Sequence, residues 1–328
     1  MISSGFMRVV WTVVLLLTFF SAVPGAQIPE DVPPDAAPQM RLGGYIQYDY
    51  LAPLGDETEA ADTFRFRRVR LLGTGAITGK IGWTASVEAT ATPILRDAYV
   101  TLKYFPAATV RVGQVVMPYG LEQYLFSSNT LAFTERVVTE LIASRDAGVV
   151  VSNERPFFGW LSYAAAVTNG TRQNVPDNNS AKDGIVRLMA TPQRLGGLQL
   201  GINAMKGEQP DGMRTRTGAD VSFERRLFHV AAELDREKTG AHPRKLGAYV
   251  FGAWRIYPRT VHPGFHHLEF GTRFGRTRNL TMPVNQWDLA ANYYVHPNLR
   301  FMCSLILHRD RAAGIPPATF HARANVRF

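Results

Sequence analysis

Apolar and polar residues alternate along most of the chain from residue 41 to the C terminus. Every second residue is apolar in 81–91 and again in 318–328, and the residues between them are polar or small. Successive side chains of a β-strand point to opposite faces, so each of these segments would have one apolar and one polar face. The pattern predicts strands that separate an apolar environment from an aqueous one.

Segments of this kind follow one another along the chain, with turn-forming residues between them. The sixteen segments are residues 41–51, 63–76, 81–91, 94–105, 109–116, 146–153, 159–168, 184–192, 197–206, 215–225, 227–236, 246–256, 265–276, 285–295, 299–309 and 318–328. Short connections such as 77–80 alternate with longer ones such as 117–145. An even strand number with this alternation is typical of bacterial outer-membrane barrels. The sequence therefore predicts an all-β fold, a 16-stranded antiparallel transmembrane β-barrel over residues 41–328.

The N-terminal segment indicates export. Arg8 precedes an apolar run from Val9 to Phe20, and small residues follow in 21–26. This is the arrangement of a secretory signal peptide, and the run is shorter than the roughly 20 residues that a membrane-spanning helix needs. We expect a signal peptide over residues 1–26, cleaved after Gly25 or Ala26. Residues 27–40 are rich in proline and acidic residues and predict an extended lead-in.

Charge and cysteine content fit an exported barrel. The chain carries a formal net charge of +9, or +8 without Arg8, which suits anionic ligands. A basic chain can also bind nucleic acid, but export argues against that partner. Cys303 is the single cysteine, so barrel closure rather than disulfides would hold the fold together. These features predict location in the bacterial outer membrane.

An arginine-rich block lies in the second predicted strand. Its basic residues are Arg65, Arg67, Arg68 and Arg70, and its apolar residues are Phe64, Phe66, Val69 and Leu71. The apolar residues change phase half-way through the block, so we expect a β-bulge near Arg67–Arg68. A charge on the lipid face costs about 2–4 kcal/mol near the midplane, so Arg65, Arg67 and Arg70 are predicted to face the lumen, with Arg68 at the bulge. Arginines in a pore favour anions, although they could also pair with acids of the wall.

Further charged residues are predicted to face inward. The basic ones are Lys103, Arg111, Arg187, Arg273 and Arg300, and the acidic ones are Asp97, Asp220, Glu224, Glu233, Asp235 and Glu269. Basic residues concentrate on the early strands, and acidic residues on the tenth and eleventh. We therefore expect an electric field across the pore rather than a uniformly positive tube.

The longest connection, 117–145, is too apolar for a loop that stays in water. Its charged residues are Glu122, Glu135, Arg136 and Arg145. Folding into the barrel as a constriction, with a short helix near 135–142, would bury the apolar residues. Packing at a contact between subunits is the alternative.

The search for catalytic and metal sites finds no known motif. His266 and His267 are expected to point to opposite faces of a strand, which disfavours chelation. Ser304 and His308 share a strand face, but that face is predicted to line the lumen, away from lipid. We expect no catalytic residue, no metal and no cofactor.

The sequence resembles the phosphate-selective porin O and P family. The resemblance rests on seven stretches that occur in family order, namely Phe64–Leu71, Leu95–Leu102, Val112–Glu122, Thr134–Arg136, Gly218–Asp220, Ala232–Glu233 and Asn292–Arg300. It implies a trimeric 16-stranded porin, often anion-selective, with outer-membrane lipid and lipopolysaccharide as surroundings.

We therefore expect a porin that lets small hydrophilic solutes diffuse passively, anions preferentially and phosphate as a candidate. Two alternatives remain open at this stage. One is an outer-membrane barrel enzyme such as a lipase, and the other is a structural or adhesive barrel without transport. Channel conductance would separate the porin from both.

Overall fold

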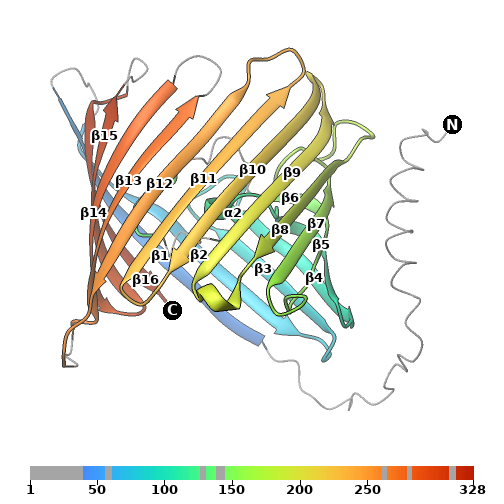
Figure 1. Ribbon diagram of the computed structural model, residues 1–328, viewed down its shortest axis with the longest axis horizontal. Helices are drawn as coiled ribbons and strands as arrows, with labels where there is room; N and C mark the ends of the chain where they lie inside the picture. Colours follow the sequence, from blue (N-terminus) through green and yellow to red (C-terminus); the bar gives the residue numbers. More distant parts are fainter. Residues whose placement is uncertain are drawn as a thin grey trace.

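The strands form one closed antiparallel barrel (Figure 1). This computed structural model describes residues 40–55, 61–125, 131–137, 145–260, 264–278, 283–309 and 315–328. Each strand pairs with its neighbours in the chain, and β1 pairs with β16 to close the sheet. The predicted 16-stranded barrel is confirmed. The expected signal peptide and lead-in lie outside the described residues, apart from Met40, where β1 begins.

The strand boundaries are close to those expected from the sequence. The strands are β1 (Met40–Leu54), β2 (Thr63–Ala76), β3 (Ile81–Glu88), β4 (Leu95–Phe105), β5 (Ala108–Val116), β6 (Arg145–Ser152), β7 (Leu161–Thr168), β8 (Asp183–Ala190), β9 (Leu198–Gln209), β10 (Gly212–Glu224), β11 (Phe228–Thr239), β12 (Lys245–Ile256), β13 (His267–Arg278), β14 (Pro283–His296), β15 (Leu299–Arg309) and β16 (Ala318–Arg327). A short helix, α2 (Leu121–Tyr124), and a 3-10 turn, η1 (Gln193–Leu195), complete the described elements. No helix among the described residues has both the length and the apolar character needed to cross a membrane.

The β9–β10 hairpin is longer than the sequence pattern predicted. The expected connection of residues 207–214 is reduced to residues 210–211, because both strands continue their alternation toward the turn. Gly212 at the turn has a φ of 108°, a conformation that glycine adopts at little cost.

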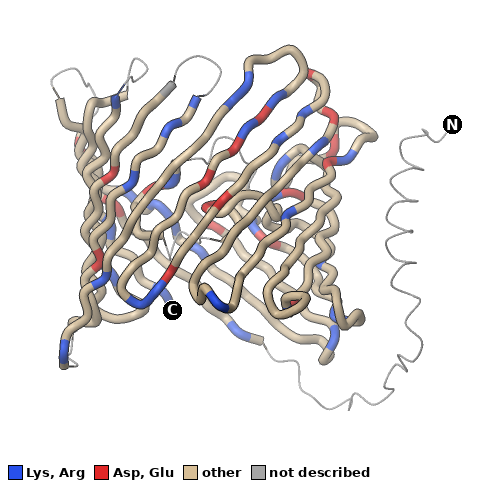
Figure 2. Tube along the Cα trace, in the orientation of Figure 1, with Lys and Arg blue, Asp and Glu red and all other residues tan. Residues whose placement is uncertain are grey.

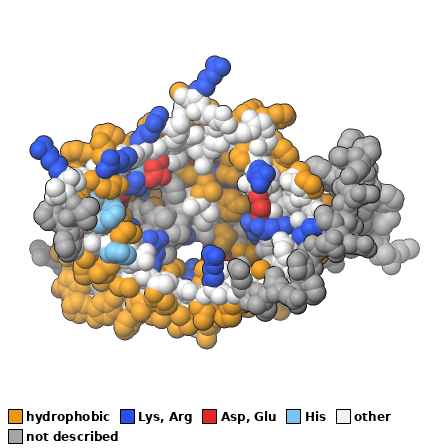
Figure 3. All heavy atoms as spheres, turned by 90° about the horizontal axis from the view of Figure 1, so that it is seen from below, with side chains coloured by type: hydrophobic (Ala, Val, Ile, Leu, Met, Phe, Trp, Pro, Cys, Tyr) orange, Lys and Arg blue, Asp and Glu red, His pale blue; other side chains and the backbone are white. Residues whose placement is uncertain are grey.

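Alternation sorts side chains between the inside and the outside of the barrel. In β1, Tyr45, Gln47 and Asp49 are buried, whereas Ile46 and Tyr48 are exposed. Viewed from the end that carries the C terminus, apolar side chains gather along much of the outer margin (Figure 3). Apolar residues therefore face the surroundings, and polar residues face the interior, as a membrane barrel requires.

The phase change predicted in the arginine-rich block is confirmed as a β-bulge. Gln47 of β1 pairs with Arg68, but the next residue, Tyr48, pairs with Phe66. Arg67 is therefore the extra residue on β2, whereas the sequence pattern placed Arg68 at the bulge; Arg68 is instead paired in register with the inward-facing Gln47. Arg65 pairs with the inward-facing Asp49, and Arg68 pairs with the inward-facing Gln47. The bulge therefore shifts by one residue which side chains of β2 point inward.

Short turns lie at the end of the barrel where β1 starts and β16 ends. Residues 106–107 and 297–298 make two of these turns, whereas the longest connection, 117–144, lies at the opposite end. Outer-membrane barrels have short turns on the periplasmic side and long loops outside. We name the two ends periplasmic and external accordingly.

Aromatic pairs mark two levels on the outer face. Phe274 and Trp287 lie toward the external end, with ring centroids 4.8 Å apart. Phe228 and Trp254 lie toward the periplasmic end, with centroids 6.4 Å apart. Aromatic girdles of this kind occur at membrane–water interfaces.

The outer face between these levels should tolerate charge poorly. Leu289 is exposed between Trp287 and Tyr293 on β14, so Leu289→Arg should lower the free energy of unfolding by about 2–4 kcal/mol. Leu307→Arg is the matched control, because Leu307 lies beside Trp287 near the interface, where the cost falls to about 0–1 kcal/mol. Denaturant unfolding in lipid vesicles measures both, and equal costs would contradict this placement of the membrane.

Candidate functional site

A group of arginines from β2, β4, β6 and the internal loop lies on one side of the lumen. We call Arg65, Arg67, Arg68, Arg70, Arg96, Arg136 and Arg145 the basic wall. Arg65 is exposed, and the other six are half-buried. Arg96, like Arg67, lies at a β-bulge, since Ser86 pairs with Asp97 while Val87 pairs with Leu95.

Four carboxylates form ion pairs with the basic wall. The distances are 3.9 Å for Arg65–Asp49, 3.1 Å for Arg67–Glu135, 3.0 Å for Arg70–Glu88 and 2.8 Å for Arg145–Asp97. By contrast, Arg68 donates to the amide oxygen of Gln47 at 2.9 Å, and Arg96 donates to that of Gln173 at 2.9 Å. Basic side chains therefore outnumber the carboxylates paired with them on this side of the lumen.

The first described part of the long connection, 117–125, is anchored to the opposite wall. The backbone N–H groups of Leu121 and Glu122, at the start of α2, donate to the two carboxylate oxygens of Glu233 at 2.8 and 2.9 Å. The N–H of Gly120 donates to the side-chain oxygen of Asn203 at 2.7 Å. Figure 1 shows α2 within the outline of the barrel. The inward face of β9 and β11 thus supplies the acceptors that the start of α2 lacks.

The second described part, 131–137, is held by β13 to β16. Arg300 donates to the carbonyl of Leu131 at 3.1 Å, and Asn292 donates to that of Ala132 at 2.8 Å. Arg323 donates to the carbonyl of Thr134. The helix expected near 135–142 falls largely on residues outside the described part of the chain, and 135–137 are not helical.

Arg273 joins the two parts of the connection to the wall. It contacts Glu122 at 3.0 Å, the carbonyl of Glu135 at 2.7 Å and Asp288 of β14 at 2.6 Å. Its guanidinium also lies 4.4 Å from the centre of the Phe133 ring. Arg273 is therefore fully buried beneath the loop rather than exposed to water in the lumen.

The inward acids of β10, β11 and β13 are also buried. Asp220, Glu233, Asp235 and Glu269 are all at most 7% exposed. Arg187 forms a bidentate pair with Asp220 at 2.7 and 2.8 Å, and neither residue is exposed. Charges of both signs alternate along these strands (Figure 2). On this side of the lumen, Asp220 is therefore paired with an arginine, and Glu233 is covered by the N–H groups at the start of α2.

The remaining residues predicted from the sequence lie in other surroundings. Lys103 is exposed near the periplasmic end and pairs with Glu154 at 2.6 Å. Arg111 is half-buried on β5, opposite Thr101. Glu224 is exposed and pairs with Arg255 at 2.7 Å. These positions lie away from the basic wall.

Sequence reasoning missed two arginines that organise the lumen. Alternation in 318–328 puts Arg323 on the polar face and points to no role for it, yet it binds Asp49 through two hydrogen bonds at 2.7 and 2.9 Å. Arg96 precedes Asp97 and would face lipid under strict alternation. The bulge that turns it is visible only in the pairing of β3 with β4.

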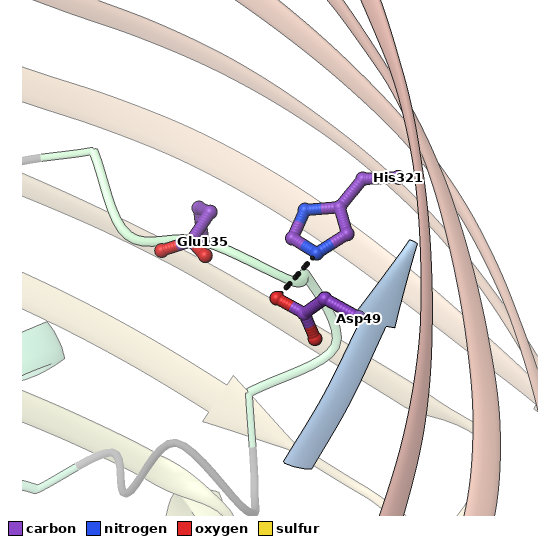
Figure 4. A group of neighbouring side chains, drawn as sticks. All are labelled: Asp49, Glu135 and His321. Atoms are coloured by element: carbon purple, nitrogen blue, oxygen red, sulfur yellow. Dashed lines mark ion pairs between the residues drawn. The ribbon is translucent and has the colours of Figure 1, made fainter. Parts of the chain in front are cut away.

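Asp49, Glu135 and His321 form the one group among the described residues that could hold a metal ion (Figure 4). Their ligand atoms lie within 4.8 Å of one another, and His321 Nε2 is 2.8 Å from Asp49. However, Arg323 already binds both carboxylates, at 2.7 Å for Asp49 and 3.1 Å for Glu135. Arg323 would compete with a metal ion for these carboxylates. The group is therefore better described as an ion-pair cluster that ties the loop to β1 and β16.

The charge of Glu135 is fixed by its neighbours. Burial raises the pKa of its carboxyl, but the hydrogen bond from Arg67 and the charges of Arg67, Arg323 and Arg68 outweigh burial and lower it to about 2. Glu135 is therefore ionised at neutral pH and offsets part of the positive charge of the basic wall.

The two adjacent histidines differ from expectation. His266 lies just before β13, so strand alternation does not separate it from His267. Their Nδ1 atoms are 2.6 Å apart, and the ring of His267 stacks on Tyr294. The prediction that the two side chains point to opposite faces is wrong.

Comparison with known proteins decides the family. The sequence profile of the family described as phosphate-selective porin O and P matches residues 40–230, more than half of the chain. The chain belongs to this family. It is therefore an outer-membrane channel of the porin type. The search of the curated proteins found no match.

Solved structures share the fold at low sequence identity. OmpT of Vibrio cholerae, described as a trimer form, has a TM-score of 0.64 at 10% identity over 89% of this chain and 100% of its own. Salmonella typhi OmpF in complex with daunomycin has a TM-score of 0.62 at 11% identity, over 88% of this chain and 97% of its own. The outer-membrane channel DcaP of Acinetobacter baumannii has a TM-score of 0.61 at 11% identity, over 90% of this chain and 98% of its own.

The buried position of Arg273 gives a test of how the loop is held. Arg273→Met leaves the buried carboxylates of Glu122 and Asp288 without this partner, so the free energy of unfolding should fall by about 3–5 kcal/mol. Arg65→Met is the control, because Arg65 is 45% exposed and lies 3.9 Å from Asp49, and it should cost less than about 1 kcal/mol. Urea unfolding in detergent measures both, and similar costs would mean that Arg273 does not anchor the loop.

Proposed function

We propose that the chain is a porin through which small hydrophilic solutes diffuse passively, with a preference for anions that arises at the basic wall. The observation that carries the proposal is the unequal exposure of the two sides of the lumen. Arg65 and Arg67 have side chains 45% and 33% exposed, whereas Arg187 and Arg273 are buried in ion pairs. A solute in the water beside the wall would meet mainly positive charge.

Two arginines favour the proposal most directly. Arg68 and Arg96 donate to neutral amide oxygens, so these hydrogen bonds do not neutralise their charge. Positive charge lining a pore raises the local concentration of anions and lowers that of cations. Weak, screened interactions of this type let a solute enter and also leave, which passive diffusion requires.

The inward acids limit this preference less than their number suggests. Asp220 and Glu233 lie beneath the loop, paired with Arg187 and with backbone N–H groups of α2 respectively. An acid that is paired and covered contributes little to the field felt by a passing ion. The half-exposed carboxylate beside the basic wall is Glu135, and it is shared between Arg67 and Arg323.

Phosphate is a candidate solute within this proposal. The planar guanidinium group can form two hydrogen bonds with one phosphate, and the basic wall offers several such groups. The family description names phosphate selectivity, and the exposed arginines of β2 are compatible with it.

The enzyme alternative has less support. Ser304 pairs with His321 across β15 and β16, and Asp49 lies 2.8 Å from His321. This brings a serine, a histidine and an aspartate together, but all three are at most 1% exposed and none faces lipid. A lipid substrate could not reach them without displacing the loop.

A structural barrel without transport is the other alternative. It differs from the proposal in having no conductance.

Removing the two arginines that bind neutral partners should reduce anion preference. In planar bilayers under a salt gradient, R68Q/R96Q should lower the chloride-to-potassium permeability ratio at least two-fold, because two positive charges leave the water-facing wall. High salt should shrink the wild-type preference, since screening shortens to about 3 Å at 1 M.

The control for this experiment is R276Q, which removes a charge from the outer face of β13. Its reversal potential should equal that of the wild type. An unchanged reversal potential in R68Q/R96Q would place the selectivity elsewhere, and the absence of any conductance in the wild type would reject the porin.

We also propose that the channel is a homotrimer. The family resemblance implies trimers, and the structurally similar OmpT is described in a trimer form. Sedimentation in a density-matched detergent should give three times the mass of the 36.5 kDa chain, less the predicted signal peptide. A monomer under mild detergent conditions would oppose this assembly.

A further inference from the structure

Basic residues gather on the outer face of the barrel at the external ends of four strands. We call this set the external basic band. It consists of Lys206 on β9, Arg236 and Lys238 on β11, Arg276 and Arg278 on β13, and Arg309 on β15. All are exposed except Lys238, which is half-buried.

Strand alternation establishes that these side chains point outward. Arg236 follows the exposed Leu234 by two residues, and Arg309 follows the exposed Leu307 by two. The residues between them face inward, such as the buried Asp235. The band is therefore separate from the basic wall of the lumen.

The pairing of the strands places the basic residues in rows. Lys206 and Lys238 lie on either side of Thr215 of β10. Arg276 and Arg309 lie on either side of Asn285 of β14. Neighbouring strands are about 4.8 Å apart, so the two basic residues of each row are roughly 10 Å apart at their Cα atoms.

The aromatic residues fix the depth of the band in the membrane. Phe274 and Trp287 contact each other on the outer face in a tilted arrangement and pair across β13 and β14. Arg276 lies two residues farther toward the external end, which is about 7 Å along a strand. Because such aromatic residues mark the edge of the hydrocarbon, Arg276 and its row reach the headgroups of the outer leaflet.

The band carries little opposing charge. None of its six members forms an ion pair within the described part of the chain. The exposed acids at the external ends of β9 to β15 there are Glu208 on β9 and Asp211 in the β9–β10 turn. The corresponding outward positions of β2 and β8 are apolar instead, for example Phe64, Phe66 and Val186. The outer face is thus basic at headgroup level on one part of the circumference.

We propose that the external basic band binds the phosphate groups of lipopolysaccharide in the outer leaflet. Arginine binds phosphate through paired, charge-assisted hydrogen bonds, and lysine supplies a point charge. The hydroxyl of Thr215 lies between two lysines and adds a neutral donor at the same level. The proposal rests on the outer-membrane location and not on the anion preference of the pore.

The test compares lipid binding to the full barrel and to two matched variants in detergent micelles. R236Q/R276Q/R278Q removes three charges from the band. R194Q/R225Q/R226Q removes three from turns at the periplasmic end, where these residues are exposed. The probes are bisphosphorylated lipid A and the same lipid after removal of both phosphates, with affinity followed by native mass spectrometry.

Wild-type protein should bind the phosphorylated lipid at least ten-fold more tightly than the dephosphorylated one. The band variant should bind the phosphorylated lipid roughly 100-fold more weakly, since each basic side chain at an anionic surface contributes about a factor of five. The periplasmic variant should bind like the wild type, and single-channel conductance should be the same in all three.

Three results would overturn the proposal. Equal wild-type affinity for the two lipids would show that phosphate is not recognised, and this comparison needs no variant to fold. If the wild type and a folded band variant bind the phosphorylated lipid equally tightly, the lipid phosphates contact another part of the barrel. An equal loss in the periplasmic variant would indicate a nonspecific effect of net charge. A wild-type barrel that binds lipid but does not conduct would reject the proposed transport and leave this inference standing.

Discussion

The structure depends on the need to pair every backbone polar group at membrane depth. Hydrocarbon offers no partner for an exposed N–H or C=O, so a sheet can span it only when no edge remains. Pairing of β1 with β16 removes that edge, over the register from Tyr45–Arg327 to Leu54–Ala318. Closure in turn fixes which face of each strand meets lipid, and alternation along the strand then assigns every side chain to the outside or the inside.

The closed barrel creates an interior that the loop partly fills. Phe133 and Leu121 pack with inward residues such as Tyr249 and Phe251 in one apolar cluster. Buried arginines satisfy the loop carbonyls and the acids beneath it, which makes their removal costly because a buried charge without a partner is strongly destabilising. The loop thus covers the acidic side of the lumen and leaves arginines of β2 in contact with water.

The sequence by itself determined the fold and the side of the wall on which most residues lie. Alternation with period two predicted sixteen strands, and the change of apolar phase between Phe66 and Val69 predicted the bulge at Arg67–Arg68. These features are local, because they depend on the two faces of a single strand. The orientation of Arg187 and Arg273 toward the interior was also determined locally, through the cost of placing charge in lipid.

Only the tertiary structure decided which inward charges remain exposed. Arg187 and Arg68 both lie on strands and point inward, but one is buried against Asp220 and the other donates to Gln47 beside the lumen. The difference arises from strands and loop residues far away in the chain, including Arg323, which lies 188 residues from Glu135. Burial and ion pairing depend on such distant neighbours, whereas a periodic pattern reports only the direction in which a side chain leaves its own strand.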